Sequence, residues 1–120
     1  MLPEILMVRE PITLADLEPL AKAWHGTLVK GAADCRRRVI ALGGDWHMDA
    51  NTALIADGSH QEDVWGFNIY PAERGADAIE YISLINIRPA QGNKAMELGD
   101  EMLRTKIREI VSNLVPDLGL

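Results

Sequence analysis

Residues 64–70, which read Val64-Trp65-Gly66-Phe67-Asn68-Ile69-Tyr70, indicate the fold most clearly. Successive residues of an extended strand point to opposite faces, so Trp65, Phe67 and Ile69 share one face. The other face receives Gly66, Asn68 and Tyr70. One apolar and one polar face predict a strand that packs its apolar side against a core.

Further short apolar runs bounded by turn residues predict more strands. They cover residues 28–34, 39–42, 52–56 and 78–88. The basic run 36–38 between the first two is expected to form a hairpin turn. Short connections favour a meander, so we expect a five-stranded, mostly antiparallel sheet. The apolar run 5–8 is either an additional short strand or an ordered arm.

Helical periodicity flanks these strands on both sides. Thr13 is a good N-cap for a helix that ends near Gly26, with Pro19 as a site of bending. Near the C-terminus, Asp100 is expected to cap a helix that Pro116 stops. Its apolar stripe consists of Leu103, Ile107, Ile110, Val111 and Leu114. The expected fold class is therefore α+β, with a sheet flanked by an N-terminal and a C-terminal helix.

The segment 78–88 is apolar on both sides of the expected strand, because Ile82 and Leu84 oppose Ile79 and Ile85. A strand that is apolar on both sides requires cover on both sides. If one helix covers one face, a second copy of the chain could cover the other. This pattern predicts a homodimer.

Composition limits what the chain can be. Its 120 residues indicate a single domain over residues 1–120, and 48% hydrophobic and 25% charged residues are typical of globular proteins. The net charge of -6 argues against nucleic-acid binding, which usually needs a basic excess. A single cysteine, Cys35, predicts a reducing compartment, the cytoplasm. The apolar runs are too short to span a membrane.

Two motifs carry a resemblance to a known family. They are Leu54-Ile55-Ala56-Asp57-Gly58-Ser59-His60-Gln61-Glu62-Asp63-Val64-Trp65-Gly66-Phe67-Asn68-Ile69-Tyr70-Pro71 and Ser83-Leu84-Ile85-Asn86-Ile87-Arg88-Pro89, the second followed by Gly92-Asn93. With these motifs, the chain from about residue 11 to 115 resembles an uncharacterised family of small bacterial and archaeal proteins, catalogued as a domain of unknown function. The resemblance implies a single compact domain and brings no activity, substrate or cofactor.

Polar residues concentrate in three stretches, 43–49, 57–63 and 86–93. If strands 64–70 and 78–88 form a hairpin, the second and third stretches are neighbours. Candidate binding residues follow from these stretches and from the polar face of the strand 64–70. They are Ser59, Gln61, Asn68, Tyr70, Asn86 and Asn93.

Clustered oxygen ligands suit a hard divalent cation such as Ca²⁺ or Mg²⁺, so Asp57 and Asp63 are weak metal candidates. A zinc site would need His47 and His60 together with carboxylates, and no compact His spacing supports it. An acidic turn that only closes a hairpin explains the same residues.

Acid–base chemistry is the other option. His47 beside a carboxylate could act as a general base, and Arg88 could stabilise a developing negative charge. The candidate catalytic residues are His47, Asp57, Glu62, Asp63 and Arg88. The structural alternative gives Arg88 to turn carbonyls and lets Asn93 cap a short helix at 94–98.

Two functions remain open. The first is a small non-enzymatic module that binds a small molecule or protein, or a second copy of itself. The second is a small hydrolase or nuclease-like enzyme that uses these candidate residues, with or without a divalent cation. No cofactor motif of the nucleotide-binding kind is present.

Overall fold

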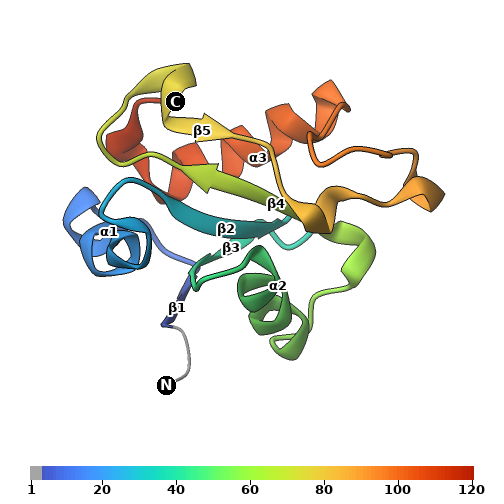
Figure 1. Cartoon of the computed structure of the whole chain (residues 1–120), viewed down its shortest axis with the longest axis horizontal. Helices are drawn as coiled ribbons and strands as arrows, with labels where there is room; N and C mark the ends of the chain where they lie inside the picture. The colour runs from blue at the N-terminus through green and yellow to red at the C-terminus, as the bar shows by residue number, and fades with distance from the viewer. Residues whose placement is uncertain (1–3) are drawn as a thin grey trace.

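The computed structural model describes residues 4–120 and has a five-stranded antiparallel sheet (Figure 1). The strand order is β1-β3-β2-β4-β5. The strands are β1 (Ile5–Val8), β2 (Val29–Asp34), β3 (Val39–Gly43), β4 (Val64–Ile69) and β5 (Ile79–Glu80). The predicted α+β class with an antiparallel sheet is therefore confirmed, while residues 1–3 of the predicted domain lie outside the described residues.

Two helical crossovers place α1 (Leu14–Ala21) and α2 (His47–Ala56). Strands β1 and β2 both pair antiparallel with β3, so they run parallel to each other, and α1 connects them. Likewise, β3 and β4 both pair antiparallel with β2, and α2 connects them. Both crossovers move toward the same edge of the sheet, but β1 and β2 run in one direction and β3 and β4 run in the opposite direction. Right-handed crossovers then require α1 and α2 to lie on opposite faces.

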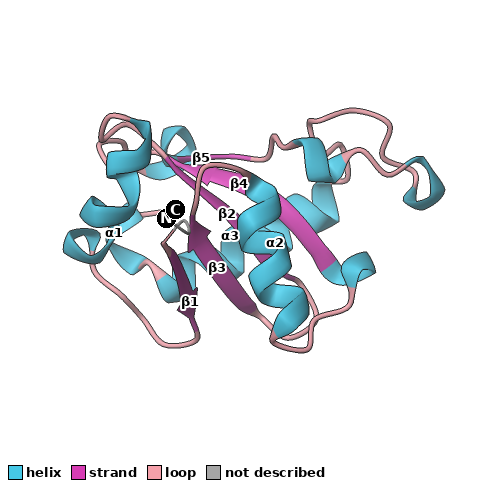
Figure 2. Ribbon diagram, turned by 60° about the horizontal axis from the view of Figure 1, so that its bottom comes forward, coloured by secondary structure: helices cyan, strands magenta, loops and turns pink. Residues whose placement is uncertain are grey.

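Side-chain packing shows this arrangement. The face of β4 that carries Trp65, Phe67 and Ile69 packs against α1 and against α3 (Glu101–Leu114). Three small residues of the opposite face, Ala32, Ala41 and Val64, pack under Ala50 and Leu54 of α2. Figure 2 shows α2 on the near side of the sheet with α3 behind the strands. Each face of the sheet therefore has its own apolar layer.

Both predicted flanking helices are present. Oδ1 of Asp100 accepts hydrogen bonds from the backbone N–H groups of Met102 and Leu103 at 2.8 and 3.2 Å, so the predicted cap of α3 is confirmed. The first helix tightens after Ala21 into a 3₁₀ turn at Lys22–Trp24. The predicted hairpin turn at residues 36–38 joins β2 to β3.

The prediction of a strand at residues 52–56 is wrong, because these residues form the second half of α2. A short apolar run does not distinguish a strand from a buried helix segment. Here the buried residues Ala50 and Leu54 are four apart, which is the spacing of one helix face. The missing strand is supplied by β1, the apolar run near the N-terminus that the sequence left open as a strand or an arm.

The prediction of one long strand at residues 78–88 is also wrong beyond its start. Only Ile79–Glu80 pair with β4, and residues 84–86 form a 3₁₀ turn. The backbone N–H of Ile85 donates to Oγ of Ser83 at 3.2 Å, which turns the chain away from an extended course.

A side chain takes the place of the missing strand at this point. Oδ1 of Asn86 accepts from the backbone N–H of Gly66 at 2.8 Å, and Nδ2 of Asn86 donates to the carbonyl oxygen of Gly66 at 3.0 Å. Asn86 is fully buried. Its amide satisfies the two backbone groups of β4 that an adjacent strand would otherwise satisfy.

Replacing Asn86 by alanine should lower the free energy of unfolding by about 2–4 kcal/mol, because it leaves a buried N–H and a buried C=O of Gly66 without partners. Urea denaturation followed by circular dichroism measures the change. Asn113→Ala, on the exposed side of α3, is the control and should change stability little. A loss no larger than that of the control would contradict the role assigned to Asn86.

Candidate functional site

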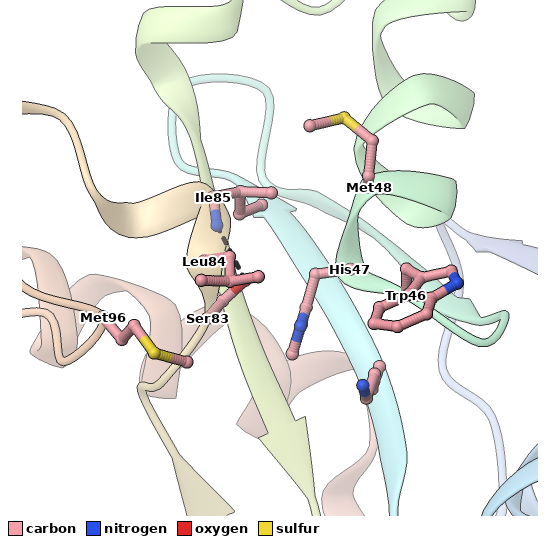
Figure 3. A pocket seen from close by; sticks show the side chains of 8 residues that line it. Trp46, His47, Met48, Ser83, Leu84, Ile85 and Met96 are labelled. Carbon is pink, nitrogen blue, oxygen red and sulfur yellow. Dashed lines mark hydrogen bonds between the residues drawn. The ribbon is translucent and has the colours of Figure 1, made fainter.

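A pocket of about 460 Å³ opens on the α2 side of the sheet, between the N-terminal end of α2 and residues 83–85 (Figure 3). In Figure 3, Trp46 and His47 lie on one side of the hollow, and Leu84 and Met96 lie on the other. The lining residues are Lys30, Trp46, His47, Met48, Ser83, Leu84, Ile85 and Met96. The walls are therefore mostly apolar, with a small number of polar groups.

The start of α2 places one wall of the pocket. Oδ2 of Asp49 accepts hydrogen bonds from the backbone N–H groups of Asp45 and Trp46 at 3.1 and 3.0 Å, which fixes the turn into the helix. Gly44 precedes this turn with φ of 85°, and a Cβ there would lie 2.8 Å from Cβ of Asp49. The turn therefore needs glycine.

The opposite wall depends on a close approach of the chain to β4. A Cβ on Gly66 would lie 2.5 Å from Cβ of Ser83, so only glycine lets residues 83–86 lie directly on the strand. Asn86 then holds this segment by its two bonds to Gly66. As a result, Leu84 and Ile85 are placed across the hollow from the first turn of α2.

A hydrogen-bond chain orients His47. Its Nε2 lies 2.7 Å from Oδ1 of Asn68 and 3.2 Å from the carbonyl oxygen of Phe67. The amide nitrogen of Asn68 donates to Glu80 at 2.8 Å, so the amide oxygen of Asn68 must face the imidazole. Both partners of Nε2 are acceptors, and Nε2 therefore carries the proton. Nδ1 has no partner among the described residues and keeps its lone pair.

Burial sets the protonation of the pocket. It lowers the pKa of His47. The hydrogen bond to Asn68 opposes this lowering, the nearby Lys30 ammonium adds to it, and Phe67 and Glu80 oppose it more weakly. Burial also lowers the pKa of Lys30. Tyr70 donates to the same Glu80 at 2.5 Å, and this bond, together with burial and the charge of Glu80, raises the pKa of Tyr70 to about 12. At neutral pH the pocket thus contains a neutral imidazole and an ammonium group.

The acidic turn that the sequence singled out lies at the other end of α2. Asp57 follows the last residue of α2, and ten helical residues place it about 15 Å from His47. Asp57 accepts from Arg9 at 2.6 and 2.8 Å and from Arg37 at 2.6 Å. These two guanidinium groups hold the pKa of Asp57 well below its usual range. Ser59 accepts a further bond from Arg37 at 2.8 Å.

Arg88 has a structural position. Its guanidinium donates to the carbonyl oxygens of Gln61, at 2.6 Å, and of Val64, and it stacks 3.6 Å from the centre of the Trp65 ring. It also donates to Oε1 of Gln91 at 3.1 Å. Burial lowers the pKa of Arg88. These contacts match the structural alternative, in which Arg88 satisfies the carbonyls of the turn.

The candidate catalytic residues are therefore not brought together as a set. His47 lies in the pocket, Asp57 is paired with two arginines, and Arg88 is bound to turn carbonyls. Glu62 and Asp63 belong to the 3₁₀ turn Gln61–Asp63 that leads into β4. Within residues 4–120, no three His, Cys, Asp or Glu side chains gather where they could hold a metal ion.

Most of the candidate binding residues hold the fold together. Gln61 exchanges two amide hydrogen bonds with Asn51, at 2.7 and 2.9 Å. The structural alternative also expected Asn93 to cap a short helix at 94–98, and this expectation is wrong because no helix forms there. Nδ2 of Asn93 donates instead to the carbonyl oxygens of Asn86, Ala95 and Glu97 and holds an irregular loop. Two of the candidates contact residues that line the pocket: Asn68 bonds to His47, and Asn86 donates to the backbone carbonyl oxygens of Ser83 and Met96.

Sequence reasoning missed most of the pocket. Lys30, Trp46, Met48 and Met96 were not among the candidates, and Leu84 was noted only as an apolar residue of a strand. One signal was available: Trp46 and Met48 are large apolar residues that lie shortly after the glycine pair 43–44, among the polar residues Asp45, His47 and Asp49. Large apolar residues in such a setting are candidates for an exposed contact surface.

The chain is thus a small α+β protein, with two helical crossovers on opposite faces of an antiparallel sheet and an apolar hollow beside α2. The model of a family described as "Protein of unknown function (DUF5674)" matches residues 6–114, and the chain belongs to this family. No curated protein and no solved structure matches the sequence. None of the helices in the described part of the chain is long and apolar enough to cross a membrane.

The pKa of His47 makes a prediction about stability. Because folding lowers this pKa, the unfolded chain binds the proton more readily, and His47 stabilises the fold only above the ordinary pKa of 6.5. The free energy of unfolding should decrease when the pH is lowered from about 7.5 to about 5.5. In the variant His47→Gln the decrease should be smaller, because glutamine does not titrate. Urea midpoints at the two pH values measure both.

The control for this titration is His60→Gln, because His60 is exposed. The charged groups that face His47 are Lys30 from β2 and Glu80 from β5. Equal pH dependence in the unaltered protein and His47→Gln would contradict the prediction.

Proposed function

We propose that this protein is a small binding module that holds a ligand with an apolar body in the pocket beside α2. The observation that carries the proposal is the hollow of about 460 Å³ with mostly apolar walls and an oriented imidazole. Small-molecule sites typically have volumes of roughly 300–1,000 Å³ and combine apolar walls with a few placed polar groups.

The distribution of exposed apolar residues supports this proposal. Trp46, Met48, Leu84 and Met96 are 63%, 53%, 62% and 41% exposed, and all four line the pocket. Single exposed apolar residues are common on protein surfaces, whereas a cluster around one hollow is typical of a binding site. Two of the four are methionines, whose flexible side chains adapt to differently shaped partners.

Binding fits the surroundings of His47 better than catalysis does. The imidazole is hydrogen-bonded to an amide oxygen and a backbone carbonyl oxygen, and the carboxylates first considered as its catalytic partners lie elsewhere. A general base needs a substrate proton within hydrogen-bond reach and a group that stabilises the developing charge. The hydrolase alternative proposed Arg88 for that second role, and Arg88 is bound to turn carbonyls.

1-Octanol, a neutral molecule with an apolar chain, is a suitable first probe. We expect it to shift the amide NMR signals of residues 46–48 and 83–85 in a saturable way, because they surround the hollow. Leu84→Glu should weaken this binding roughly tenfold or more, since it places a charge in the apolar wall.

The matched control is Met102→Glu. Met102 is an exposed apolar residue of α3, 83% exposed, and it does not line the pocket. It should leave the octanol affinity unchanged. Absence of saturable shifts, or equal loss of affinity in both variants, would contradict the proposed site.

Self-association is a second candidate, and the exposure of Leu84 favours it. The sequence places Leu84 on the second apolar side of the segment 78–88, and Leu84 is 62% exposed beside the pocket. If two copies pack through this surface, light scattering at micromolar concentration should give the mass of a dimer. Leu84→Glu should reduce that mass to a monomer, and a monomeric mass for the unaltered chain would contradict the dimer.

A further inference from the structure

Lys30 is the cation of the pocket, and its position is set by the centre of the sheet. It lies on β2, the middle strand, opposite Asn68 of β4 in the register. Its Nζ lies 4.0 Å from the centre of the Trp24 ring and 5.4 Å from that of the Trp46 ring. Two indole rings thus hold the ammonium group at the pocket and take the place of part of its water.

Within residues 4–120, Lys30 has no ion pair. The carboxylates whose charge acts on Lys30 are those of Asp45 and Asp49, and neither forms an ion pair with it. Asp49 accepts instead from the backbone N–H groups of Asp45 and Trp46. The chain has 18 acidic and 12 basic residues, so a carboxylate partner would be easy to supply. A partly buried ammonium group that forms no direct ion pair is stabilised by an anion that binds it.

We infer that the ligand of this pocket is a small carboxylic acid with an apolar body, whose ionised carboxylate binds the Lys30 ammonium group while the body contacts Trp46, Met48, Leu84 and Met96. This inference rests on the proposed function, since it assumes that the pocket binds a ligand. It adds the charge and the chemical class of that ligand.

The charge of the site favours a carboxylate over a phosphate. A phosphate group carries up to two charges and is usually bound by arginine forks, several cations or free backbone N–H groups. The pocket lining contains one lysine and no arginine. The Asp49 carboxylate, which accepts from the backbone N–H groups of Asp45 and Trp46, places a negative charge at the start of α2 and disfavours a doubly charged anion there. A single positive charge matches a single negative one.

Three probes with the same eight-carbon chain test the inference: octanoate, 1-octanol and octylamine. Their dissociation constants are measured by NMR titration at about pH 7.5, where a carboxylic acid is ionised and a primary amine is protonated. Octanoate should bind roughly tenfold more tightly than octanol, because a charge-assisted hydrogen bond is added. Octylamine should bind more weakly than octanol, because its ammonium group would face Lys30.

In the variant Lys30→Gln, the ratio of the octanol and octanoate dissociation constants should fall to about one, whereas Lys30→Arg should keep the preference for octanoate. Lys106→Met is the control, because this exposed lysine lies on α3 and not in the pocket lining. If Lys30→Gln fails to fold, salt serves as the test in the unaltered protein. Added salt should weaken octanoate binding and leave octanol binding nearly unchanged.

The possible results separate the two proposals. Equal affinity for octanoate and octanol, or a preference that survives in Lys30→Gln, would overturn the carboxylate inference while the apolar pocket stands. Tighter binding of octylamine would overturn it as well, since the indole rings would then select a cation. If none of the three probes binds, the proposed function fails and this inference fails with it.

Discussion

The pocket depends on the contact between the amide of Asn86 and the backbone of Gly66. Strand β5 ends after two residues, so β4 would otherwise have unpaired backbone groups beside α2. One side-chain amide satisfies both the N–H and the C=O of Gly66, and Gly66 has no side chain to keep residues 83–86 away. A regular strand in this position would continue the sheet and leave a flat edge. Because a side chain replaces it, the chain is free to turn and to form a wall.

A second constraint acts from the other side of the hollow. Two right-handed crossovers that step the same way place α1 and α2 on opposite faces, and α1 shares its face with the long helix α3. The other face has α2 as its only long helix among the described residues, and α2 has ten residues. It covers Ala32, Ala41 and Val64, while Lys30 lies at the hollow beside its first turn. The pocket is thus the part of this face that α2 leaves uncovered.

The sequence predicted features that depend on local patterns and missed those that depend on distant side chains. The faces of residues 64–69 and the cap at Asp100 follow from residues a few positions apart. Residues 52–56 were misassigned because a short run of five shows no clear period. The partnership of Lys30 with Trp24 and Trp46 has no sequence signature, because it depends on how three segments pack.

The floor and the rim of the hollow differ in how much they can move. Lys30 stands on the central strand of the sheet, where paired neighbours on both sides restrict the backbone, whereas Met48 and Met96 are long, exposed side chains without branches. A ligand in the pocket would contact one group on a rigid strand, Lys30, and flexible methionine side chains around its apolar part. Such a design discriminates strongly at one end of its ligand and tolerates variation at the other. It would serve a set of related molecules rather than a single one.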